Sequence, residues 1–182
     1  MNLIPRLLGL GLFALLTLLV LSCESSKPAE FGSPNRIKGE VVAKPESRLV
    51  VQITDSLTDF KTPRADLAAA FIRQFGDGTV VDKILVRQPP GTEKSGGTYY
   101  LIGMGLRNGM YRAMALPLTS GGDNSFYLRP SAERYILTST GCPTCYFEFE
   151  DQRIVGTTCS ENTGNSRCDL KVVSSNQMFA AR

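Results

Sequence analysis

Residues 98–116 read TYYLIGMGLRNGMYRAMAL, and the fold that the sequence predicts is built outward from this stretch. Asn108-Gly109 is typical of a type I′ turn, because both central residues of that turn need a positive φ. The flanking runs, Thr98–Met104 and Tyr111–Leu116, have the apolar and aromatic composition of strands. The stretch therefore predicts an antiparallel β-hairpin.

A helix is predicted ahead of this hairpin, over Arg64–Phe75. Thr62 is a suitable N-cap, Pro63 suits the first helical position, and Gly76 suits the left-handed position that ends a helix. The apolar residues of this segment form one stripe. They are Leu67, Ala68, Phe71, Ile72 and Phe75. A stripe of this kind needs a sheet to cover it.

Further strands are predicted before the helix and on both sides of the hairpin. They are Val41–Val42, Leu49–Ile53, Val80–Arg87, Phe126–Leu128, Arg134–Leu137 and Tyr146–Glu150. One helix packed on an antiparallel β meander is an α+β fold. The order of elements resembles that of a cystatin-like roll, and a small barrel flanked by the helix is the alternative. The loop Gln88–Gly97, rich in Pro and Gly, is a candidate binding loop.

The beginning of the chain has the features of an export signal. Arg6 precedes an apolar run, Leu7–Leu21, that is too short to cross a hydrocarbon layer of roughly 30 Å comfortably. Ser22-Cys23, followed by polar residues, resembles the lipobox of bacterial lipoproteins. The resemblance implies that Cys23 becomes the mature N-terminus and carries acyl chains such as palmitate. The resemblance also favours the outer membrane of the bacterial cell envelope as the location, because no Asp follows Cys23.

The sequence divides into three parts. Residues 1–22 are predicted to be a lipoprotein signal peptide, residues 23–40 a flexible tether, and residues 41–182 a single domain with its own core. The net charge of +3 is spread without a run of Lys or Arg, which gives no footprint for nucleic acid.

Four further cysteines lie within residues 139–170. They are Cys142, Cys145, Cys159 and Cys168. An even number of cysteines in an exported domain predicts two disulfides that brace the C-terminal region, with three pairings left open. Cys142 and Cys145 also have the C-x-x-C spacing of a redox pair, although a strand-like segment, Tyr146–Glu150, follows where a redox protein has a helix. A closed zinc site with four sulfur ligands is the third interpretation.

The search for an enzyme is largely negative. The chain has no histidine, which excludes Ser-His-Asp and Cys-His catalysis and histidine-based metal centres. Glu148 and Glu150 would share one strand face, but we interpret them, like Asp55 and Asp59, as solvated acids and not as a catalytic pair. We therefore predict a protein that is not an enzyme and that needs no cofactor and no metal.

The aromatic residues do not identify a ligand. They lie on neighbouring predicted strands, where an exposed row could stack on sugar or peptide, but we interpret them as packing residues. They are Tyr99, Tyr100, Tyr111, Phe126, Tyr127 and Tyr135.

The sequence thus predicts a lipid-anchored envelope protein that binds or scaffolds an envelope protein or glycan. One alternative is a thiol–disulfide redox protein that uses Cys142 and Cys145. Another is an inhibitor of an extracellular enzyme, because Ser131–Tyr135 has a faint resemblance to a segment of lipoprotein lysozyme inhibitors.

Overall fold

A computed structural model of the chain describes residues 47–54, 57–90, 97–161 and 164–179. All of these residues lie in one compact unit, Ala43–Arg182. The signal peptide, Cys23, the tether over residues 23–40 and the expected strand Val41–Val42 fall outside the described residues.

One helix and ten strands are found in the described residues, so the fold is mostly β. The helix is α2 (Arg64–Phe75). The strands are β1 (Arg48–Thr54), β2 (Leu57–Phe60), β3 (Val80–Arg87), β4 (Tyr99–Arg107), β5 (Met110–Ser120), β6 (Ser125–Leu128), β7 (Arg134–Thr140), β8 (Cys145–Glu150), β9 (Arg153–Cys159) and β10 (Arg167–Val173). The expected helix on an antiparallel sheet is confirmed, whereas the α+β label overstates the helical share.

The long strand β5 organises the main sheet. One of its edges pairs with β4, and β3 pairs with the far side of β4. Its other edge is shared, because Arg112–Ala115 pairs with β7 while Thr119 and Ser120 pair with β6. From there β10 follows β7, and β1 and β2 follow β6. The sheet bends about β5 into a nearly closed barrel, which is nearer to the small barrel than to the open roll.

The central hairpin is confirmed. Asn108 and Gly109 have φ angles of 49° and 77°, and Arg107 pairs with Met110 across the turn. The expected meander is confirmed as far as β6, which pairs with β5, but it is wrong after β6, since β6 also pairs with β1 and β7 returns to the edge of β5. Side-chain burial explains this change of pairing partners. Phe126 of β6 is buried on the helix side of the sheet, whereas Tyr135 of β7 is buried on the opposite side.

The bounds of α2 match the prediction, but its start differs. Pro63 is the N-cap, and no side chain caps the helix. The hydroxyl of Thr62, expected to be that cap, donates to the carbonyl oxygen of Leu49 at 3.0 Å. Thr62 therefore fastens the start of the helix to β1.

The C-terminal end of α2 is as expected. Gly76 has a φ of 64°, and its N–H donates to the carbonyl oxygen of Ile72 at 3.2 Å. Ile72 itself was wrongly placed in the core stripe, because it is 38% exposed. The buried face consists of Leu67, Ala70 and Phe71.

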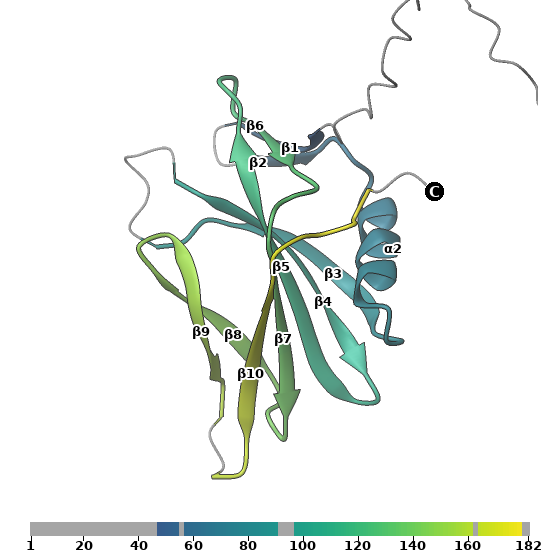
Figure 1. Ribbon diagram of the computed structural model, residues 1–182, viewed down its shortest axis with the longest axis vertical. Coiled ribbons are helices and arrows are strands. Elements are labelled where there is room, and N and C mark those ends of the chain that lie inside the picture. The colour runs from purple at the N-terminus through teal and green to yellow at the C-terminus, as the bar shows by residue number, and fades with distance from the viewer. Residues whose placement is uncertain (1–46, 55–56, 91–96, 162–163, 180–182) are drawn as a thin grey trace, which may run out of the picture. The chain divides into compact units, whose positions relative to one another are not determined.

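Both faces of the central strands are covered (Figure 1). On one face α2 packs against β3, β4 and β5, and β1 and β6 complete this core. On the other face lies the β8–β9 hairpin, a separate two-stranded sheet, whose Phe147 and Ile154 pack against Tyr100 and Leu137. The described residues include no helix long and apolar enough to cross a membrane.

The segment after β10 closes the helix-side core. The Asn176 amide nitrogen donates to the carbonyl oxygens of Arg129 at 2.9 Å and Ala132 at 2.8 Å. These bonds place Met178 in the core, where it is buried. The last described residues are therefore part of the domain.

Candidate functional site

The four cysteines of residues 139–170 form the two predicted disulfides. Cys142 is bonded to Cys159 and Cys145 to Cys168, each with a Cα–Cα distance of 5.9 Å. Cys145 lies opposite Cys159 in the β8–β9 ladder but is bonded to β10. The two bridges thus fasten the open end of the hairpin to the segment after β7 and to β10.

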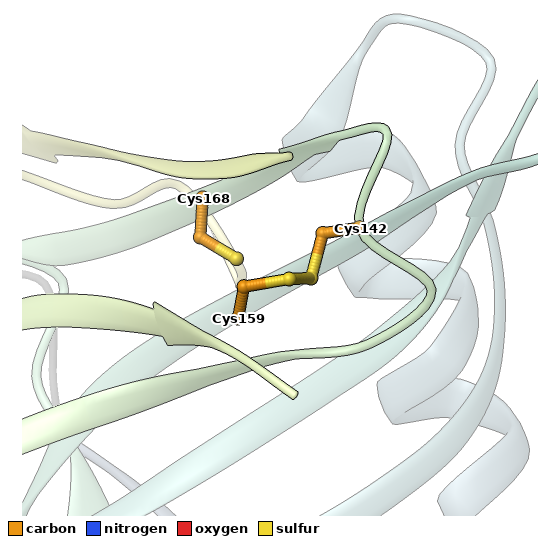
Figure 2. A group of neighbouring side chains, drawn as sticks. All are labelled: Cys142, Cys159 and Cys168. Atoms are coloured by element: carbon orange, nitrogen blue, oxygen red, sulfur yellow. A yellow bond between two sulfur atoms is a disulfide. The ribbon is translucent and has the colours of Figure 1, made fainter. Parts of the chain in front are cut away.

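The sulfur atoms lie close together. Those of Cys142, Cys159 and Cys168 are within 4.8 Å of one another, and Figure 2 shows the Cys168 sulfur pointing at the Cys142–Cys159 bridge. In the disulfide form these sulfurs are not thiolates, the species that binds zinc and attacks disulfides. The cysteines of the C-x-x-C spacing are bonded to different partners, and Cys142 and Cys145 are only 5% and 2% exposed. This arrangement favours a structural brace.

An open groove lies between β8 and the face of the main sheet, and we name it the β3–β8 groove. Its volume is about 440 Å³. Apolar side chains from β3, β4 and β8 line it, among them Leu85, Ile102, Met104, Leu106, Tyr146 and Phe147. Cys145 is also in its wall, so the bridge to Cys168 helps to fix the position of β8.

Charged residues stand along the β3 side of the groove. Asp82, Lys83 and Arg87 contribute to its lining, which gives it a small excess of positive charge. The Arg87 guanidinium carbon lies 5.2 Å from the centre of the Phe149 ring. Leu106 and Tyr146 are about half exposed, at 51% and 49%. The groove therefore combines accessible apolar surface with charge.

A second, polar hollow of about 770 Å³ lies beside the β8–β9 turn, and Arg129, Glu133 and Arg153 are among its lining residues. Gln152 in this turn accepts two hydrogen bonds. Its carbonyl oxygen accepts one from the Tyr100 hydroxyl at 3.0 Å, and its side-chain oxygen accepts one from the Thr98 N–H at 3.1 Å. Most of the candidate binding loop, residues 91–96, is outside the described residues.

The aromatic residues mainly pack, as predicted. Tyr100, Phe126 and Tyr135 are buried, and the ring centres of Tyr99 and Phe126 are 4.4 Å apart. Burial, followed by the hydrogen bond to Glu133, raises the pKa of Tyr135, and burial also raises the pKa of Tyr100. These phenols are neutral core groups and do not form an exposed platform for sugar.

The acids behave as expected where they are described. Glu148 and Glu150 are exposed on β8, and Phe149 between them is partly buried. Asp59 is exposed and paired with Lys61, while Asp55 lies outside the described residues.

An ion-pair cluster around Asp77 was not anticipated. One carboxylate oxygen of Asp77 is 2.8 Å from Arg112 and 3.3 Å from Arg107, and the other accepts the N–H and hydroxyl of Thr79. Burial acts to raise the pKa of Asp77, but the Thr79 hydrogen bonds and the two arginine charges outweigh it and lower that pKa. Arg112 also donates to the Thr138 hydroxyl at 2.7 Å. The cluster joins the loop after α2 to β4, β5 and β7, and only its Asp-Gly-Thr turn was recognisable in the sequence.

No protein-family model matches this chain, and neither a curated protein nor a solved structure matches it.

Proposed function

We propose that this chain is a lipid-anchored protein of the bacterial outer membrane, held there through Cys23, whose domain binds another envelope protein in the β3–β8 groove. The groove carries the proposal. Concave apolar surface with a few charged groups is the usual form of a binding site. Apolar patches left accessible on a folded domain mark interaction sites more often than isolated apolar residues do.

The geometry of the groove supports a protein as the partner. Its apolar lining follows three strands and includes the half-exposed side chains of Leu106 and Tyr146. The polar hollow is larger but has no exposed aromatic ring among its lining residues, since its Tyr100 is buried and hydrogen-bonded. Sugar recognition would gain little from ring stacking there.

The redox alternative is less well supported. Cys142 and Cys145 are not bonded to each other, and both are buried. A redox partner must bring its thiolate to an accessible sulfur. The inhibitor alternative finds no specific support among the described contacts.

Site-specific photo-crosslinking in the source bacterium tests the proposal. A photoreactive amino acid replaces Tyr146 in the groove of the full chain and, in a control, Val172 of β10, which is similarly exposed at 51%. We expect an adduct with an envelope protein from position 146 alone, and its loss when Leu106→Glu is added. The same adducts from both positions, or none from position 146, would contradict the proposal.

Lipidation is tested separately on the full chain. We expect an alkyne analogue of palmitate to label the protein, and Cys23→Ser to abolish both the label and recovery in the membrane fraction. Retention of the label in Cys23→Ser would contradict the assignment of the anchor.

A further inference from the structure

We infer that the partner inserts an extended segment, with alternating apolar and acidic side chains, as an additional strand on the free edge of β3. This inference rests on the proposed function and specifies what the groove receives. Addition of a strand to a sheet edge is a common mode of peptide recognition, in which main-chain hydrogen bonds provide affinity and pockets for alternate side chains provide specificity.

The edge of β3 is open in the described part of the chain. There β3 pairs with β4 alone, and its other edge has no neighbouring strand. The backbone groups of such an edge can accept another strand.

Hollows lie on both faces of the sheet along this edge. On one face is the β3–β8 groove, into which Leu85 projects. On the opposite face is a hollow of about 490 Å³ between β3 and α2, which we name the α2-side hollow. Arg64, Ala68 and Ile84 line it, and Asp82 and Lys83 line both.

An added strand fits this arrangement because its successive side chains point to opposite faces of a sheet. One set would enter the β3–β8 groove, and the alternate set would enter the α2-side hollow. The two sets of side chains would therefore enter different hollows.

The chemistry of the two hollows differs. The groove offers mainly apolar side chains, as Met104 and Phe147 illustrate, and its charged residues stand only along its β3 side. The α2-side hollow carries Arg64 and Lys83 against one acid, Asp82. An apolar residue suits the first and a carboxylate suits the second, which gives the alternating pattern.

The same charges discourage wrong pairing. β3 has a register irregularity between Val81 and Lys83, and exposed Asp82 and Lys83 lie on its edge. Bulges and charges on an edge strand are features by which proteins avoid indiscriminate edge-to-edge association. An acidic strand would gain from Arg64 and Lys83, whereas a second copy of β3 would bring further cations to the same edge.

Fluorescence polarisation with the full chain in detergent micelles tests the inference. The probe is a fluorescein-labelled peptide, acetyl-Leu-Glu-Val-Glu-Leu-Glu-amide, and the control contains the same residues in the order Leu-Leu-Val-Glu-Glu-Glu. We expect the alternating peptide to bind at least about tenfold more tightly, because only it separates the two side-chain types between the faces. Equal affinities, or no binding of the alternating peptide, would overturn the inference.

Backbone methylation tests strand pairing directly. The alternating peptide is methylated on one alternate set of amide nitrogens or on the other, which blocks hydrogen bonds at one edge of the added strand. We expect one set to weaken binding roughly tenfold or more and the other to have little effect, because only one edge faces β3. Similar losses from both sets would show that no strand is added.

Charge reversal locates the acidic side chains. We expect Arg64→Glu to weaken the alternating peptide about tenfold. Arg167→Glu on β10, where the Arg167 side chain is 69% exposed, should leave its affinity unchanged. An equal effect of both variants would show general charge attraction and contradict the assigned hollow.

Crosslinking separates the two proposals. If the peptide fails while the groove-dependent adduct from position 146 persists, strand addition is wrong and protein binding in the groove stands. If the adduct is absent as well, the proposed function fails with it.

Discussion

The two faces of the central sheet are covered by different means. On the helix face, Phe71 of α2 is fully buried and packs directly over Gly103, which has no side chain to keep the ring away from the sheet. On the opposite face the β8–β9 hairpin is joined to the rest of the domain by the bridges Cys142–Cys159 and Cys145–Cys168, and it leaves the β3–β8 groove open. At its centre the helix face is closed by packing, whereas the opposite face is partly closed by a hairpin held with covalent bonds.

This difference bears on how a small domain keeps a binding site open. An isolated two-stranded hairpin is marginally stable at best, because it buries little surface. Two bridges stabilise the hairpin without requiring it to cover the sheet completely. The groove can therefore stay open beside a rigid wall, whereas a cavity beneath Phe71 would remove apolar contacts from the main core.

Loss of both disulfides should reduce the stability of the domain more than any other change that we predict. The local loosening should be concentrated on the face covered by the β8–β9 hairpin. Replacing all four bridge cysteines with Ser should cost about 2–4 kcal/mol per bridge, because the unfolded chain is no longer restrained. We expect amide hydrogen exchange in β8 and β9 to accelerate far more than in β4 and β5. Urea unfolding of the variant measures the total loss of stability.

The pattern of exchange decides whether the faces are distinct. If amides of β4 and β5 lose protection together with those of β8 and β9, the hairpin and the helix-side core unfold as one unit. The contrast between a packed face and a bridged face would then be wrong.

On the helix face, the largest losses of stability should come from substituting glycines that lie very close to another part of the chain. A Cβ at Gly105 would lie 1.8 Å from the carbonyl oxygen of Val80, and one at Gly103 would lie 2.6–2.8 Å from the Phe71 ring. We expect Gly103→Ala to cost about 1–3 kcal/mol and Gly105→Ala to cost more, because backbone cannot move aside as a side chain can. Urea denaturation measures both.

Gly122→Ala is the matched control, since a Cβ there would meet nothing within 4 Å. Its free energy of unfolding should stay within about 0.5 kcal/mol of the wild type. A cost for Gly103→Ala as small as that of the control would show that Phe71 does not need the gap in the sheet.

The Asp77 cluster should make the free energy of unfolding depend on pH. The pKa of Asp77 is lowered in the folded state, so its contribution is present at neutral pH. It declines as the pH falls below the ordinary carboxyl value of about 3.9 and is lost below the folded-state pKa. We expect Asp77→Asn to cost about 1–2 kcal/mol at pH 7, because a carboxylate paired with Arg112 becomes a neutral amide.

Urea unfolding at several pH values checks the direction of this pH dependence. The difference in free energy of unfolding between the wild type and Asp77→Asn should shrink as the pH falls through that range. Asp169→Asn on β10 serves as the control, because its pair with Arg167 is largely exposed and should contribute little. A difference that grows in acid would contradict a lowered pKa for Asp77.

The sequence predicted the parts of the fold that depend on local chemistry. Asn108-Gly109 specifies its turn through two positive φ angles, and Gly76 specifies the end of α2 in the same way. The disulfides followed from the number of cysteines and the expected compartment. In each case the determining residues lie close together in the chain or share one chemistry.

Long-range order was not predictable in the same way. Nothing local to Phe126 or Tyr135 specifies that β6 leaves β7 and pairs with β1, since each strand is placed by burial against distant residues. The short strand β2 was missed, as were β9 and β10, whose alternation is weak. The groove was missed for the same reason, because its lining comes from β3, β4 and β8.

The smallest effect we predict is the cost of replacing a glycine in the left-handed conformation, compared between the two faces of the sheet. Gly76 after α2 and Gly141 beside Cys142 have similar φ angles, 64° and 66°, and a Cβ at either would meet no atom closer than 3.6 Å. Substitution by Ala should therefore cost about 1 kcal/mol at both, from the left-handed conformation alone. Measured again after reduction of the disulfides, the cost at Gly141 should fall, because the segment that carries Cys142 is no longer held in that conformation, while the cost at Gly76 should stay the same. An unchanged cost at Gly141 would mean that packing, and not the bridges, sets the conformation on the hairpin face.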